Sequence, residues 1–239
     1  GPPLTLETEA MATATSPTIA TLRRPPLARK APKPGECVNL RAFKPAPHGR
    51  RLTASQLVAD DTTEGELHLT PTEHNLPRLV DGFRVTNSVK CLRLRCNRHV
   101  PADRALAHLL PAFMLNKTID TVDVVAQSLS APGMLHLGKA LGYSKYITDV
   151  DVSRNCLDDA AAHHLAHAVK DSFSMTRLNA SHNLIQGPGA AAVGKALARN
   201  QTLRDLSLDY NVVGEQGGAA IATALSVNSA LTRLSLRSA

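Results

Sequence analysis

Three histidines and two aspartates lie together in the segment DDAAAHHLAHAV, and both residue types bind metal ions. In a helix, Asp159, His163 and His167 share one face because they follow one another at intervals of four residues. A zinc protease helix would require a glutamate directly after the first histidine, whereas His164 follows His163 here. The repeat described below also puts these histidines on the solvent side of a helix. We therefore expect a solvated face and no metal site.

The four cysteines are too few for a disulfide scaffold, and none shows the paired spacing of zinc ligands. Cys91 and Cys96 are too far apart for a CxxC pair, and Cys37 and Cys156 add no cluster. We expect Cys91 and Cys96 to be reduced thiols in a reducing compartment.

The glycine-rich segments indicate structural turns rather than an enzyme. GPGAAAVGK resembles a phosphate-binding loop, but Ala196 follows Lys195 where that loop requires serine or threonine. GEQGGAAIA recurs in the same register, and the sequence has no GxSxG motif. No run of eighteen apolar residues is present, so we expect no membrane span. The sequence predicts a protein that is not an enzyme and needs no cofactor.

The elements that carry these residues repeat every 28 residues. Four segments begin 28 residues apart, at Ile147, Met175, Leu203 and Leu231, and earlier copies begin at Val89 and Ile119. Apolar residues recur at the first, fourth and sixth places of each copy, and asparagine recurs at the ninth. Ala180, at a sixth place, is smaller than the residues at the equivalent places. Gln127 is the exception at the ninth place. Each copy predicts a short strand and a turn, followed by a helix, and the fixed period predicts a solenoid.

The predicted helices bury aliphatic side chains at matched places, which explains an aromatic content of only 3%. These places hold Leu137, Leu165, Val193 and Ile221, then Leu141, Val169, Leu197 and Leu225, with Ala140, Ala168, Ala196 and Ala224 between them. Five glycines are expected to allow tight turns and close approach of helix and sheet, namely Gly187, Gly189, Gly214, Gly217 and Gly218.

The LxxLxLxxN strands and the following helices, as in GPGAAAVGKALARNQTL, resemble leucine-rich repeats of the long, ribonuclease-inhibitor-like type over residues 89–239. A degenerate capping repeat is predicted over residues 61–88, with a strand at Leu67 and Leu69 and a helix through Leu79 and Phe83. The resemblance implies an α/β leucine-rich repeat solenoid, with a curved parallel sheet on the concave side and helices on the convex side. The sequence stops at Ala239, directly after a strand, and we expect the native chain to continue or a partner to cover that end.

Side chains between the strand leucines would point to the concave face and form columns of equivalent residues. The column Asp149–Arg177–Asp205–Arg233 predicts a charge ladder that neutralises itself, because neighbouring strands lie about 4.8 Å apart. The alternative is a polar patch for a protein partner, with Tyr210 and Arg154 as the main contacts. The candidate partner-binding residues are Arg93, Arg95, Asp149, Asp151, Arg154, Arg177, His182, Asp205, Asp209, Tyr210 and Arg233.

The net charge of +7 comes mainly from a proline-rich N-terminal arm, predicted over residues 1–60. Its nine cations are Arg23, Arg24, Arg29, Lys30, Lys33, Arg41, Lys44, Arg50 and Arg51. Such a composition cannot build a core. It is typical of a solvated leader, of an arm that binds an acidic protein or nucleic acid, or, less well, of an organelle transit peptide.

These features together favour a non-enzymatic scaffold subunit that binds other proteins, with the arm anchoring it in a large assembly. Similar long-repeat families include ribonuclease inhibitor, NOD-like receptor sensors, the Ran GTPase-activating protein, tropomodulins and ciliary regulatory subunits. We favour a microtubule-based assembly such as the axoneme, hence the cytoplasm with its cytoskeleton or cilium, because tubulin surfaces are acidic. The alternatives are a GTPase-activating regulator and a ribonucleoprotein component.

Overall fold

The computed structural model describes residues 65–72, 76–85 and 89–239. The predicted arm over residues 1–60 lies outside the described residues with its basic cluster, as does Cys37. None of the described helices is long and apolar enough to span a bilayer.

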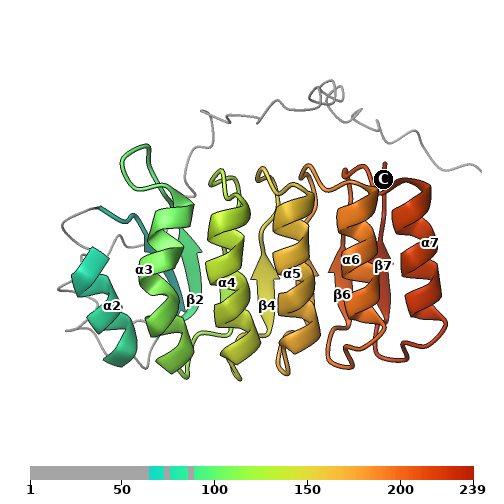
Figure 1. Ribbon diagram of the computed structural model, residues 1–239. Helices are drawn as coiled ribbons and strands as arrows, with labels where there is room; N and C mark the ends of the chain where they lie inside the picture. The colour runs from blue at the N-terminus through green and yellow to red at the C-terminus, as the bar shows by residue number, and fades with distance from the viewer. Residues whose placement is uncertain (1–64, 73–75, 86–88) are drawn as a thin grey trace, which may run out of the picture. The chain divides into compact units, whose positions relative to one another are not determined.

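Strands and helices alternate along the whole described chain. They are β1 (Gly65–Leu69), α2 (Leu76–Val85), β2 (Val89–Leu94), α3 (Ala102–Leu115), β3 (Thr121–Asp123), α4 (Ala131–Tyr143), β4 (Asp149–Asp151), α5 (Asp159–Asp171), β5 (Arg177–Asn179), α6 (Gly187–Leu197), β6 (Asp205–Ser207), α7 (Gly214–Leu225) and β7 (Arg233–Ser235). The seven strands of the described residues form one parallel sheet in chain order. Figure 1 shows the helices side by side over one face of this sheet. The predicted α/β repeat architecture is confirmed.

The strand register follows the 28-residue period. In the backbone register of the sheet, Thr121 lies beside Asp149 and Asp149 lies beside Arg177. Arg177 lies beside Asp205 in the same way, and Asp205 beside Arg233. The predicted columns are therefore real neighbours across the sheet. The strand at Leu67 and Leu69 also exists, as β1, and pairs with β2 through one irregularity in register.

The core lies between the sheet and the helices, as the apolar places of the repeat predict. Residues of the first, fourth and sixth places are buried from Val89 to Leu208. The last repeat differs, since Leu231, Leu234 and Leu236 are only partly buried. Leu225 is 40% exposed, so the prediction that it is a core residue is wrong. Among the described residues no helix packs on the outer side of α7, so the side chain of Leu225 remains exposed to solvent.

The asparagines of the ninth place form a hydrogen-bonded ladder. Asn183 accepts from the backbone amides of Asn155 and Leu157 in the preceding repeat, both at 3.2 Å. Its side-chain amide donates to the carbonyls of Val152, Ala180 and Ser181 at 2.9–3.2 Å. One buried side chain thus satisfies backbone groups of two neighbouring repeats, as expected for a turn asparagine.

A second polar ladder, not noticed in the sequence, lies where each helix ends. Its members are 28 residues apart at Asn116, Ser144, Ser172, Asn200 and Asn228. Asn200 accepts from the amides of Thr202 and Leu203 and donates to the carbonyls of Val169 and Ser172. The same spacing could have identified this ladder, because asparagine or serine recurs at every step.

Glycines permit close packing at some of the predicted positions but not at all of them. A Cβ on Gly189 would lie 2.5 Å from a carboxylate oxygen of Asp159, and Gly214 has a left-handed φ of +58°. Gly218, in contrast, has no atom within 4 Å of such a Cβ, so its predicted role in close packing is wrong.

Candidate protein-binding face

The candidate site is the sheet face, which is the side of the sheet opposite the helices. In each of the strands β3 to β6 the middle residue is buried, while its two neighbours are partly or fully exposed. This alternation brings the predicted polar columns onto one surface.

The first column consists of two ion pairs instead of a continuous ladder. Arg177 pairs with Asp149, and Nη1 of Arg233 lies 2.7 Å from a carboxylate oxygen of Asp205. The described residues contain no ion pair between Arg177 and Asp205. The hydrogen bond from Arg177 to Asp149, and then the charge of Asp149, raise the pKa of Arg177. These four charges largely satisfy one another at an exposed surface, where such pairs contribute little stability.

A second column lies two residues further along the strands and includes Arg93, Asp123, Asp151 and Asn179; its charged groups also interact with neighbours on the same face. Arg93 Nε and Arg95 Nη1 lie 3.2 and 3.5 Å from the carboxylate of Asp123, which sequence reasoning had left out of the candidate set. Asp151 accepts from the side-chain amide of Asn179 and from the backbone amide of Ser153, both at 2.9 Å. Asp151 therefore holds the ends of two strands.

A third column, two residues further again, includes Ser153, Ser181, Asp209 and Arg237, and Asp209 connects it to the last strand. One of its carboxylate oxygens accepts from the hydroxyl of Ser235 at 2.7 Å and from the backbone amide of Arg237 at 2.6 Å. Burial opposes ionisation of Asp209, but these hydrogen bonds, together with the nearby charges of Arg237 and His182, lower its pKa. Asp209 is therefore ionised at neutral pH and serves the backbone.

The fourth column has an unusual backbone conformation. Ala126, Arg154, His182, Tyr210 and Ser238 all have left-handed φ angles, between 52° and 58°. A side chain in this region costs roughly 1–2 kcal/mol. The turns are held by backbone hydrogen bonds to the next repeat from the amides of Ala126, Arg154, His182 and Tyr210. The amide of His182, for example, donates to the carbonyl of Asp209 at 2.8 Å.

Three side chains of this column form what we call the aromatic corner: Arg154, His182 and Tyr210. The rings of His182 and Tyr210 are stacked, with centroids 4.2 Å apart and planes 15° from parallel. Burial, and then the positive charge of Arg154, lower the pKa of His182. The negative charge of Asp209 raises it by less. His182 is thus neutral at pH 7. Tyr210 remains 51% exposed despite the stacking.

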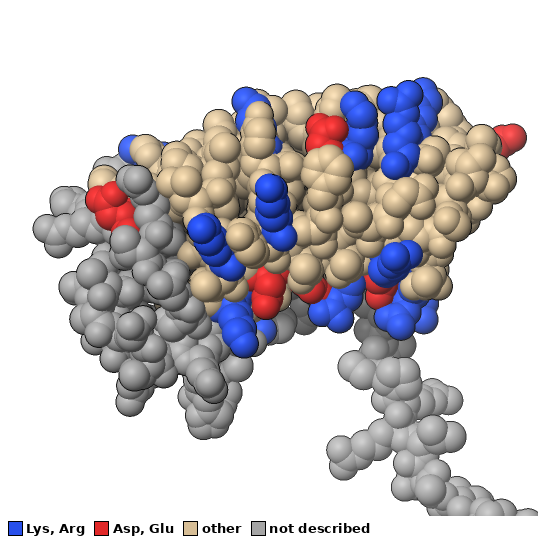
Figure 2. Space-filling view, turned by 90° about the horizontal axis from the view of Figure 1, so that it is seen from below, with Lys and Arg blue, Asp and Glu red and all other residues tan. Residues whose placement is uncertain are grey.

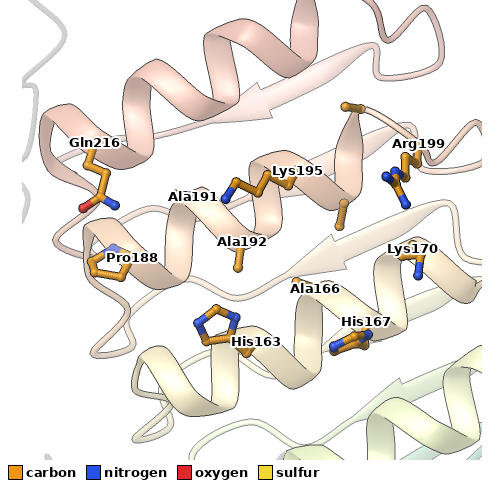
Figure 3. Close-up of a pocket in the computed structure, with 12 residues that line it drawn as sticks. His163, Ala166, His167, Lys170, Pro188, Ala191, Ala192, Lys195, Arg199 and Gln216 are labelled. Carbon is orange, nitrogen blue, oxygen red and sulfur yellow. The ribbon is translucent and has the colours of Figure 1, made fainter.

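The histidines of α5 do not assemble into a metal site with Asp159. That carboxylate accepts from the backbone amides of Gln186 and Gly189, at 2.7 and 3.1 Å, where α6 begins. His163 and His167 are exposed, as the repeat predicts. They line an open groove between α5 and α6 (Figure 3). No group of residues in the described ranges is arranged to hold a metal ion.

Comparisons with known proteins support the fold. Residues 199–222 match the family described as "Leucine Rich repeat", and no curated protein matches the sequence. A solved structure titled "Leiomodin-1 Actin-Binding Site 2 (ABS2)" is 23% identical, with 54% of this chain and 76% of that chain covered and a TM-score of 0.51. A tropomodulin C-terminal domain from Caenorhabditis elegans is 17% identical, with 78% and 81% covered and a TM-score of 0.41. The first similarity concerns the fold alone, and the second is too weak to support an argument.

Proposed function

Because the chain is a leucine-rich repeat protein, we propose that it is a non-enzymatic binding module whose sheet face contacts a protein partner. The observation that carries this proposal is the aromatic corner. Arginine and tyrosine are the residue types that dominate binding energy at protein interfaces. The 28-residue period supports the long, ribonuclease-inhibitor-like subtype of repeat.

The contrast with the rest of the face supports this choice of contact residues. Arg177, Arg233 and Asp151 are engaged with neighbours on the same face. Tyr210 instead presents a large, half-exposed ring at the turn, and its backbone is already fixed in one conformation. A rigid aromatic surface loses little entropy when a partner covers it, which favours binding.

The test is site-specific photo-crosslinking of the full chain in the cells that produce it. A photoreactive phenylalanine at position 210 is expected to crosslink a protein, and the substitution Arg154→Ala is expected to reduce the yield severalfold. The matched control places the same group at position 177 on the same face. No crosslink from position 210, or an equal yield of the same product from position 177, would contradict the proposal.

We further propose that the N-terminal arm anchors the protein in a large cytoskeletal assembly, preferably one built on microtubules. The support is its composition, with nine cations and one acid over residues 20–51, since tubulin surfaces are acidic. The leiomodin title names an actin-binding site, which makes actin filaments the second candidate.

Co-sedimentation of the full chain with purified microtubules and with actin filaments tests the anchoring. Replacing the nine arm cations by alanine is expected to abolish pelleting, and raising the salt should weaken pelleting of the unaltered chain. Pelleting that survives the replacement would refute the role of the arm. Binding to RNA but to neither filament would favour the ribonucleoprotein alternative.

A further inference from the structure

A second surface, on the helix side, has exposed aromatic rings that the core does not explain. Five aromatic side chains lie in the part of the chain whose side chains the structure describes, and only Phe113 is buried. Tyr143, in the last turn of α4, is 67% exposed, and Phe173, just after α5, is 83% exposed. A repeat protein built from aliphatic residues gains nothing in stability from rings placed in water.

Open grooves lie on both sides of α5, and the rings of Tyr143 and Phe173 border the one between α4 and α5. The α4–α5 groove has a volume of about 770 Å³, and its lining includes Leu135, Lys139, Tyr143 and Phe173. The α5–α6 groove has a volume of about 630 Å³ and an alanine-rich floor that includes Ala166. His167 and Lys170 line both grooves, so α5 forms a shared wall. We call the two together the helix-side grooves.

The net charge of the helix-side grooves is positive. Their lining contains Lys139, Lys170, Lys195 and Arg199, and its one acid, Asp171, lies 3.9 Å from Lys170. Across the described residues, Lys139, Lys195 and Arg199 take part in no ion pair. Figure 3 shows Lys195 on α6 and Arg199 in the turn after α6 beside the groove, with His163 and His167 opposite on α5. Basic side chains also predominate over the edge where the helices end, seen from below in Figure 2.

We propose that the helix-side grooves bind an acidic, amphipathic segment of a partner protein. Its carboxylates would meet Lys139, Lys195 and Arg199, and its apolar side would cover the alanine floor and the rings of Tyr143 and Phe173. Amphipathic segments commonly bind to other proteins in this way, with an apolar side in a groove and charges at the rim. The site is distinct from the sheet face.

The grooves suit a protein segment better than other occupants. A phosphate backbone would satisfy the lysines but would leave the apolar floor and Leu135 uncovered. The chain's own arm is also unsuitable, because residues 20–51 carry nine cations and one acid. An acidic peptide with aliphatic or aromatic side chains matches both properties of the grooves.

The test begins with random peptides displayed on phage and selected on the full chain. Selected peptides are expected to be rich in Asp and Glu, with apolar residues three or four positions apart. One such peptide is then synthesised and its affinity measured by fluorescence anisotropy. Affinity should fall at least about tenfold for Lys139→Glu with Lys195→Glu, and likewise for Tyr143→Ser with Phe173→Ser.

The matched control is Arg98→Glu with Val212→Ser, which changes an exposed cation and an exposed apolar residue outside the grooves. It should leave the affinity within about twofold. Circular dichroism checks that every variant is folded.

Selected peptides without acidic residues, or equal affinity for the charge-reversed variant, would overturn the proposal. Tighter binding of single-stranded RNA, lost on the same substitutions, would assign the grooves to nucleic acid. The substitution Tyr210→Ala should not affect the peptide, which separates this site from the sheet face.

Discussion

At the scale of single residues, the asparagine ladder is the feature with the clearest energetic consequence. Asn183 is buried and makes five hydrogen bonds to backbone groups of its own and the preceding repeat. Removing such a side chain leaves buried donors and acceptors without partners, and each costs about 1–3 kcal/mol.

We predict that Asn183→Ala lowers the free energy of unfolding by about 2–4 kcal/mol, measured by urea denaturation. The matched control is Asn97→Ala, at the same place of an earlier repeat, where the side chain is exposed and water can replace it. Equal losses in the two variants would show that burial of the amide is not the cause.

His182 provides a prediction about pH. Its pKa is lowered in the folded protein, so below about pH 6.5 the unfolded chain binds more protons than the folded one. The contribution of His182 to the stability of the fold is therefore complete above its pKa in the unfolded chain. It is lost as the pH falls through its lower pKa in the folded protein. An NMR titration should place the pKa of His182 below 6.5, and Arg154→Ala should raise it. A value at or above 6.5 in the native protein would contradict the stacked, partly desolvated arrangement.

Cys96 is expected to be an unreactive thiol. Burial, and then the negative charge of Asp103, raise its pKa to about 12, although Arg95 opposes this. Because the thiolate is the reactive form, alkylation by iodoacetamide at pH 8 should be at least about a hundredfold slower in the native protein than in urea. Mass spectrometry of the Cys96 peptide measures both rates, and similar rates would show that the thiol is accessible and ionised.

At the scale of elements, the spacing between neighbouring helices decides which glycines are needed. A Cβ on Gly194 of α6 would lie 2.9–3.1 Å from backbone atoms of Ala220 and Ile221 in α7. Gly218 of α7 faces open space instead. Both residues occupy helices, so their effects on helix propensity are comparable while their surroundings differ.

We predict opposite signs for the same substitution at these two positions. Gly194→Ala should destabilise the protein by about 1–3 kcal/mol, because α6 and α7 must move apart. Gly218→Ala should stabilise it by about 0.5–1 kcal/mol, because alanine favours the helix and has room. Thermal unfolding of the two variants measures the difference. A gain in stability at Gly194 would mean that the two helices tolerate a wider separation.

At the scale of the whole molecule, each repeat is stable only through its neighbours. Leu206 is fully buried between repeats, whereas Leu234, at the equivalent place one repeat later, is partly exposed. In this 239-residue chain, Leu206→Ala should cost about 2–5 kcal/mol of unfolding free energy and Leu234→Ala less than about 2 kcal/mol. Chemical denaturation of both variants tests this, and equal losses would contradict a stack whose burial depends on position.

The sequence by itself determined the repeat, the strand register and most of the core. A fixed period places each residue beside its equivalents, so Leu178 must neighbour Val150 and Leu206. The sequence also indicated which columns face away from the helices. It erred at Leu225 and Gly218, where burial depends on whether another element packs against the residue.

Only the tertiary structure decided how side chains use those positions. Equal spacing could not reveal that Arg177 pairs with Asp149 and not with Asp205, or that His182 stacks on Tyr210, since both depend on rotamers and backbone angles. The capping of α6 by Asp159 and the grooves beside α5 likewise depend on how closely neighbouring helices approach. The physical reason is that a period defines which residues are neighbours, while contacts between them depend on distances of a few ångströms.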